Sequence, residues 1–148
     1  MFPKDKLVAM TSNLKNYGAQ FGLEFNQLKV LSNSHLSLIA GEYARDHGKF
    51  HEYHEEIFKA YFTFGEDIGK MEVINKILNN LNLDTDKFAS SIKENLYEDK
   101  LKQASSAAHI NEINSTPTFI INNKYAVIGA QPLDSFKKVL LDMEQNNI

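Results

Sequence analysis

The stretch Asn114–Pro132, which reads NSTPTFIINNKYAVIGAQP, decides how the C-terminal part of this 148-residue chain folds. Thr118–Ile121 and Tyr125–Ile128 are short apolar runs, and the Asn122-Asn123 pair between them can adopt the positive φ angles of a tight turn. Pro132 suits the first turn of a following helix. We therefore predict a β-hairpin and a C-terminal helix.

The first strand of this hairpin is apolar at consecutive positions, Phe119, Ile120 and Ile121. Such a strand presents apolar side chains on both faces, as a central strand with neighbours on both sides does. The sequence offers one clear partner strand, and a two-stranded sheet alone is marginal in water. We infer that the hairpin belongs to a larger sheet that these 148 residues do not encode.

The residues ahead of the hairpin predict helices, because apolar side chains recur there at steps of three and four. The first stripe consists of Leu7, Met10, Leu14, Tyr17 and Phe21. An extended connection follows from Leu23 to Leu31, Gly48 ends the second helix, and one of the residues 84–86 opens the fifth. We expect a mainly α protein with a C-terminal hairpin, in which residues 1–110 form a helical subdomain and residues 111–148 a ββα half. Both would pack as one compact unit.

Composition and charge exclude several classes of protein. The chain has 16 basic and 19 acidic residues, a net charge of −3, and no basic cluster, which argues against nucleic acid as a partner. Neither an apolar run of about 18 residues nor the apolar core of a secretory signal is present, so we expect a cytoplasmic protein outside the membrane. The chain contains no cysteine, which rules out a disulfide framework and cysteine-based zinc sites.

Histidines and aromatic residues are the remaining candidates for chemistry. His51 and Glu55 are spaced to place two metal ligands on one helical face, but a solvated flank is the favoured interpretation, and we expect no metal site. His54 is interpreted as a hydrogen-bonded core or interface residue. A set of aromatic residues could line a ligand groove, although helical spacing favours a place in the core; the set is Tyr53, Phe58, Tyr61, Phe62 and Phe64.

The order of these motifs resembles a known family. Thr116-Pro117-Thr118-Phe119, two further apolar residues, a hairpin turn and Gly-Ala-Gln-Pro at 129–132 resemble the DsbA-like family of thioredoxin-fold proteins. The closest resemblance is to its FrnE-type branch, which is related to 2-hydroxychromene-2-carboxylate isomerases. Upstream segments resemble the helical insertion of that family, so the resemblance extends from about Lys6 to the last helix; they are His35-Leu36, Glu42–Ala44, Gly48–Glu52, Ile57–Phe62 and Asp67–Gly69.

The resemblance implies a thiol–disulfide oxidoreductase whose catalytic part is absent. In the family, a βαβ unit with Cys-x-x-Cys precedes the helical insertion, and a cis-proline loop faces its sulfur atoms. Thr116 and Pro117 match that loop, which contacts bound peptide, and the resemblance favours a cis bond between them. No residue matches either catalytic cysteine, so no catalytic residue and no cofactor are expected. The chain begins inside the insertion, which predicts a truncated family member.

Three functional hypotheses follow. In the first, the chain is redox-silent by itself, because thiol exchange requires a thiolate. In the second, the free edges of the 118–128 hairpin pair with a second copy or with a separate partner chain. In the third, the protein is a glutathione-linked isomerase or transferase. A peptide or small thiol would bind near Thr116-Pro117 in the first and third cases.

Overall fold

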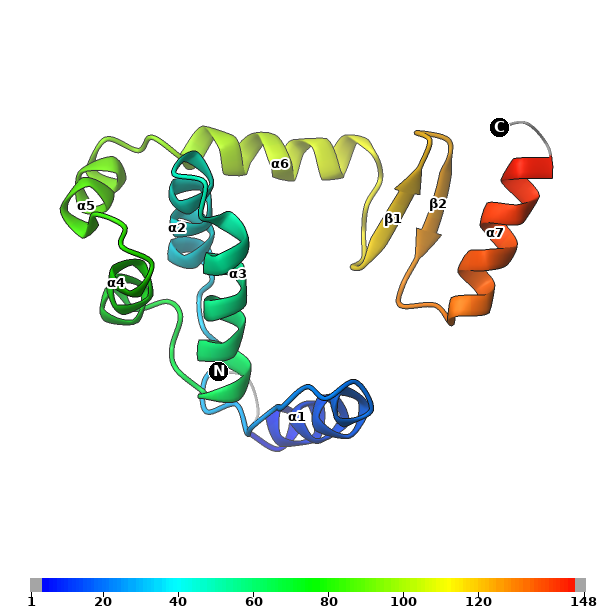
Figure 1. Cartoon of the computed structure of the whole chain (residues 1–148), viewed down its shortest axis with the longest axis horizontal. Coiled ribbons are helices and arrows are strands. Elements are labelled where there is room, and N and C mark those ends of the chain that lie inside the picture. The colour runs from blue at the N-terminus through cyan, green and yellow to red at the C-terminus, as the bar shows by residue number, and fades with distance from the viewer. Residues whose placement is uncertain (1–3, 146–148) are drawn as a thin grey trace. The chain divides into compact units, whose positions relative to one another are not determined.

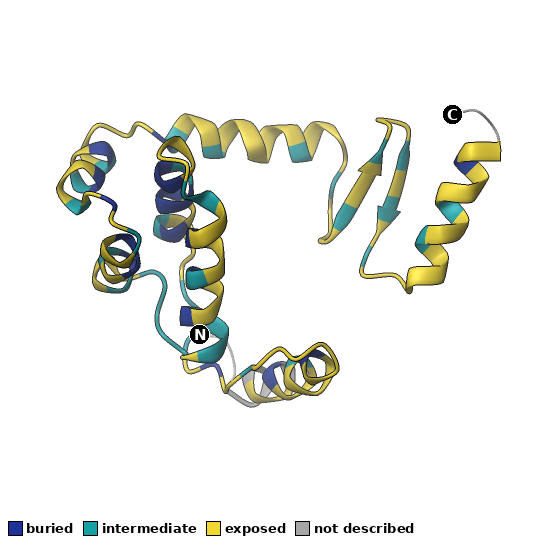
Figure 2. Cartoon of the chain, in the orientation of Figure 1, coloured by how far each residue is buried: buried dark blue, intermediate teal, exposed yellow. Residues whose placement is uncertain are grey.

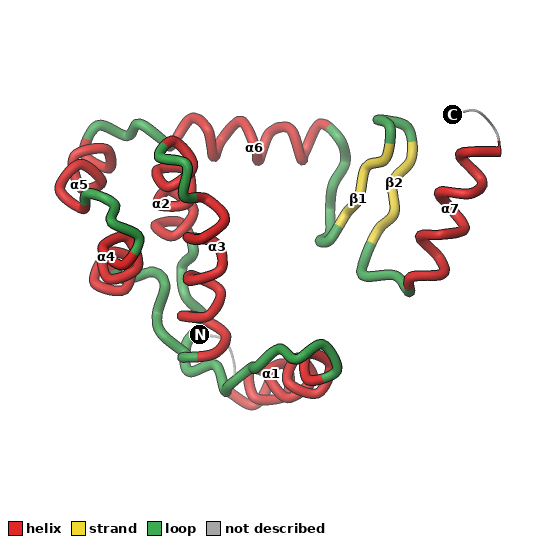
Figure 3. The backbone as a smooth tube through the Cα atoms, viewed as in Figure 1, coloured by secondary structure: helices red, strands yellow, loops and turns green. Residues whose placement is uncertain are grey.

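The computed structural model describes residues 4–145, which divide into two compact units, one ending at Leu101 and the other beginning at Lys102. Figures 1 and 3 show the elements along the chain. They are α1 (Lys4–Ala19), α2 (His35–Asp46), α3 (Phe50–Phe58), the π-helix η1 (Lys59–Thr63), α4 (Met71–Asn80), α5 (Thr85–Lys93), α6 (Glu98–Ile110), β1 (Thr118–Ile121), β2 (Tyr125–Ile128) and α7 (Leu133–Gln145). The mainly α fold with a C-terminal hairpin is confirmed.

Local signals in the sequence set the ends of several helices. The Asp84 carboxylate accepts hydrogen bonds from the backbone N–H groups of Asp86 and Lys87, both at 3.0 Å, and so caps α5. Gly48 follows α2 with a φ of 68°, a conformation that glycine adopts without strain. Asn95, at φ 54°, lies in the turn between α5 and α6.

The core of the first unit lies among α2, α3, α4 and α5, where the buried residues of Figure 2 gather. Phe88, Ile74 and Leu78 are its largest fully buried side chains. Two buried tyrosines connect elements through their hydroxyl groups, since Tyr43 donates to the carbonyl of Asp84 at 2.8 Å and Tyr53 to that of Ser37 at 3.0 Å. Burial raises the pKa of Tyr53, so its phenol stays protonated.

The predicted extended connection is present and runs along the end of the α3–η1 helix. The Asn26 N–H donates to the carbonyl of Phe62 at 2.8 Å, and the Tyr61 hydroxyl donates to the carbonyl of Val30 at 3.2 Å. Leu28 from this segment is buried. No helix in residues 4–145 is both long and apolar enough to cross a bilayer.

The C-terminal part of the first apolar stripe is exposed. Tyr17 and Phe21 are 62% and 64% exposed, because none of the described helices packs broadly against α1. Leu14 is partly buried, whereas the side chains of Leu7 and Met10 lie outside the described part of the chain.

In the second unit, β1 and β2 form an antiparallel sheet of two strands within the described residues. Asn122 and Asn123 have φ angles of 51° and 54°, and the Lys124 N–H donates to the carbonyl of Ile121 at 3.1 Å. The predicted turn is thus confirmed. Helix α7 packs on one face of the hairpin, where the Phe119 and Phe136 rings meet edge to face with 4.9 Å between centroids.

Candidate functional site

The loop that enters β1 carries the two residues predicted to bind substrate, and both are exposed. The Thr116–Pro117 peptide bond is cis. The Gly129 N–H donates to the carbonyl of Pro117 at 2.8 Å, and the Thr118 hydroxyl donates to that of Ser115 at 2.7 Å. Within residues 4–145 the backbone N–H and C=O of Thr116 have no hydrogen-bond partner. They are therefore available to a bound ligand.

The outer edge of β1 is unpaired in the described part of the chain. Phe119 lies opposite Val127 in the register of the hairpin. Because the Gly129 N–H donates to the Pro117 carbonyl, the residues of β1 that direct their backbone groups toward β2 are Phe119 and Ile121. Thr118 and Ile120 therefore direct their N–H and C=O groups away from β2. The outer edge of β2 differs, because the Gln131 side-chain amide donates to the Ile128 carbonyl there at 2.9 Å.

The uncovered face of the hairpin is apolar. Ile120 is 45% exposed and Ile128 60% exposed, although both belong to a β element whose other face packs on α7. A small cavity of about 140 Å³ lies against this face, between the strands and residues 111–115. Both the edge and this face of the hairpin thus offer surface to a partner.

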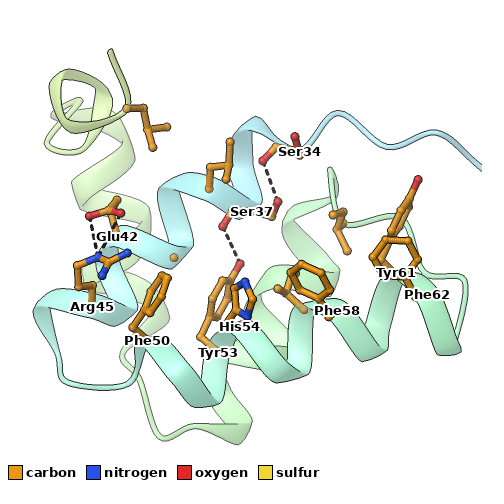
Figure 4. A pocket seen from close by; sticks show the side chains of 15 residues that line it. Ser34, Ser37, Glu42, Arg45, Phe50, Tyr53, His54, Phe58, Tyr61 and Phe62 are labelled. Atoms are coloured by element: carbon orange, nitrogen blue, oxygen red, sulfur yellow. Dashed lines mark hydrogen bonds and ion pairs between the residues drawn. The ribbon is translucent and has the colours of Figure 1, made fainter. Parts of the chain in front are cut away.

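A second, larger cavity lies within the first unit. It has a volume of about 470 Å³, lies between α2 and α3, and is called here the α2–α3 groove. Figure 4 shows the rings of Phe50, His54 and Phe58 along one wall. The Tyr53 hydroxyl bond to Ser37 lies at its floor, and the Arg45–Glu42 ion pair at one end.

This groove corrects the interpretation of the aromatic set. Tyr53 is buried as expected, but Phe58 is 50% and Phe64 64% exposed. Phe58, Tyr61 and Phe62 line the groove together with Tyr53, whereas Phe64 does not. The core interpretation failed because helical spacing identifies an apolar face without identifying the neighbour that covers it.

One of the two histidines considered above, His54, does not lie in the core. His54 is exposed and is not a core residue, because Tyr53 and Ile57 occupy the buried side of α3 and the next position points about 100° away. His51 is exposed, as expected, and His47 contacts the Tyr43 carbonyl through Nδ1 at 2.8 Å. No three His, Asp or Glu side chains in the described residues are grouped so that they could hold a metal ion.

The first turn of α6 is attached to α2 by ion pairs. Glu98 contacts His35 Nε2 at 2.8 Å, and Lys100 Nζ contacts Asp46 Oδ1 at 2.8 Å. The hydrogen bond from Lys100 lowers the pKa of Asp46. Because these groups are partly exposed, each pair contributes little to stability. Leu101, which follows Lys100 in this turn, lines the α2–α3 groove.

Comparison with known proteins agrees with the fold. The sequence matches the DSBA-like thioredoxin domain over residues 3–141, which is nearly its whole length. The chain therefore belongs to the DsbA-like thioredoxin-domain family, as the sequence motifs indicated. It is also 27% identical over 137 residues to the uncharacterized protein YwbO of Bacillus subtilis strain 168, in an alignment that covers 90% of this chain and 68% of that protein.

Proposed function

We propose that this chain supplies the helical insertion and the ββα half of a DsbA-like thiol–disulfide oxidoreductase of the FrnE-type branch, and that by itself it exchanges no disulfides. Residues 1–110 would form the insertion and residues 111–148 the ββα half. The family membership supports the activity class, and the exposed Thr116-Pro117 loop with its unpartnered backbone groups supports a role in holding an extended peptide. The single observation that carries the proposal is that the 148 residues contain no thiol.

An insulin-reduction assay with dithiothreitol tests this proposal. The protein should precipitate the insulin B chain no faster than dithiothreitol alone, because no residue can form the mixed disulfide. The control is the chain joined at its N-terminus to a βαβ unit with Cys-x-x-Cys from a family member, which should accelerate precipitation. Robust turnover by the 148 residues alone would contradict the proposal.

A second candidate function is association through the hairpin, in which the outer edge of β1 accepts a strand. The accepted strand would come from a second copy of the chain, in a homodimer with two-fold symmetry, or from a βαβ partner. The outward backbone groups of Thr118 and Ile120 favour β1 over β2, whose outer carbonyl at Ile128 is already bonded to Gln131. The exposed apolar face of the hairpin adds surface for the accepted strand.

Light scattering after size exclusion separates these cases. The wild-type chain should elute as a dimer, and Ile120→Pro should shift it to a monomer because proline removes an outward N–H without removing a bond to β2. Ala126→Pro is the matched control, because its N–H points outward from β2, and it should stay dimeric. A wild-type monomer whose β1 amides are protected from hydrogen exchange would contradict association.

The glutathione-linked alternative predicts binding of reduced glutathione near Thr116-Pro117. Millimolar glutathione should then release or absorb heat in calorimetry and shift the amide resonances of residues 115–118. The absence of both effects would remove this candidate without affecting the other two.

A further inference from the structure

The continuous helix formed by α3 and η1 has a second apolar face that the core does not use. Its core side consists of Tyr53, Ile57 and Ala60, which are all buried. On the adjacent side, Phe50, His54, Phe58 and Phe62 follow one another at steps of four, with ring centroids 5.7, 4.4 and 5.6 Å apart. This row, called here the ring ladder, forms one wall of the α2–α3 groove (Figure 4).

Gly41 keeps the groove open from the side of α2. Glycine destabilises a helix interior relative to alanine, yet Gly41 lies in the middle of α2 without a positive φ. A Cβ at this position would lie 3.7 Å from the Tyr53 ring and 3.8 Å from the Phe50 ring, which is ordinary van der Waals contact. Neither the backbone nor its neighbours therefore require glycine, and the missing side chain leaves space beside the ladder.

A positive charge lies at one end of the ladder. The Arg45 guanidinium lies 3.6 Å from the centroid of the Phe50 ring, and its Nε donates to the Glu42 carboxylate at 3.3 Å. A guanidinium has five N–H donors, so this bond leaves its terminal nitrogens for another acceptor. The Arg45 side chain is half exposed at the groove.

We propose that the α2–α3 groove binds a small aromatic carboxylate, whose ring lies against the ring ladder and whose carboxylate contacts Arg45. The cavity of about 470 Å³ falls within the size range of small-molecule sites. A row of tilted aromatic rings favours a planar aromatic ligand, which can meet the ring faces and edges. The guanidinium favours a carboxylate through a planar, two-bonded contact. The site lies wholly within the first unit, so it does not depend on the thiol chemistry proposed above.

Isothermal titration calorimetry with benzoate, cinnamate and 1-naphthoate tests the site. At least one of the three should bind with a dissociation constant below one millimolar. 1-Naphthylmethanol, which has the same ring system and no charge, should bind at least tenfold more weakly than 1-naphthoate. If none of the three acids binds, the proposal is overturned; equal affinity for the acid and the alcohol would overturn the role of Arg45.

Variants assign any binding to the groove. Arg45→Gln should abolish the preference for the acid over the alcohol, and Glu42→Gln should tighten acid binding because it removes a competing carboxylate. Gly41→Leu should weaken both probes at least tenfold by filling the cavity. Gly41→Ala, which adds one methyl group, gives a smaller loss and serves if the leucine variant does not fold. Ser90→Ala, at an exposed position of α5, is the control and should bind as the wild type does. Unchanged binding in both Gly41 variants would overturn the proposal.

Discussion

Replacing Gly41 with alanine should stabilise the first unit, although the substitution fills part of a cavity. Alanine is preferred over glycine in a helix interior by about 0.8–1 kcal/mol. Its methyl group would enter a buried position in contact with the Tyr53 and Phe50 rings, and burying one such group contributes about 0.8 kcal/mol. The free energy of unfolding should therefore rise by about 1.5–2 kcal/mol.

Urea unfolding followed by circular dichroism at 222 nm measures this change, and a thermal scan should show a rise in Tm of roughly 6–16 °C. Two other glycines provide controls in which the same substitution should destabilise. A Cβ at Gly69 would lie 2.9 Å from the Asn33 carbonyl oxygen, which is too close. Gly48 has a φ of 68°, where a residue with a Cβ is strained by roughly 1–2 kcal/mol.

Destabilisation of Gly41→Ala to the level of the two controls would refute the reasoning, because it would mean that no space exists beside the ring ladder. If Gly41→Ala is more stable than the wild type and binds an aromatic acid more weakly, then the glycine lowers the stability of α2 and keeps the groove open for a ligand. Such a relation is common at binding sites.

Three further predictions concern stability. Tyr53→Phe should lower the free energy of unfolding by about 1 kcal/mol at pH 7, because a buried hydrogen bond to Ser37 is lost. Burial raises the pKa of Tyr53, so the wild type loses stability as the pH rises above about 10, where the phenol of the unfolded chain ionises. The urea midpoints of the wild type and Tyr53→Phe should therefore converge above that pH. Asp84→Ala should lower the urea midpoint at pH 7, because the hydrogen bonds from the Lys87 and Asp86 N–H groups to this carboxylate are lost. These bonds depress the pKa of Asp84, so the stability that the carboxylate contributes is present at neutral pH and is lost as the pH falls through the lowered pKa. The difference in urea midpoint between the variant and the wild type should therefore close in acid. Lys100→Ala should lower the free energy of unfolding by less than about 1 kcal/mol, because the ion pair between Lys100 and Asp46 is partly exposed. A larger loss in urea unfolding would contradict this prediction.

The sequence predicted those features that depend on neighbouring residues. Asn122-Asn123 indicated the hairpin turn because few residues other than glycine tolerate positive φ, and Asp84 was among the candidates for a helix cap. Gly48 marked the end of α2 for the same local reason. The resemblance, and not periodicity, directed attention to Thr116-Pro117, since a proline ahead of a strand is common in unrelated folds.

Features that depend on distant packing could not be predicted in this way. Tyr17 and Phe21 belong to a regular apolar stripe, yet burial requires a neighbour that the stripe itself does not specify. The π-helix at Lys59–Thr63, where the Phe64 N–H donates to the Lys59 carbonyl at 2.9 Å, likewise has no signature in the spacing of its residues.

The α2–α3 groove nevertheless had a signal in the sequence that spacing alone concealed. Between Phe50 and Phe62, apolar and aromatic residues occupy an arc wider than the single stripe by which a helix packs on one layer of neighbours. An arc of that width leaves part of its surface outside the core unless a second layer covers it. A glycine in the interior of the preceding helix, at Gly41, makes such coverage by the chain itself less complete, because it removes the side chain that would fill the space. A broad aromatic arc following a helix with an interior glycine thus predicts a core face and a ligand face on the same helix.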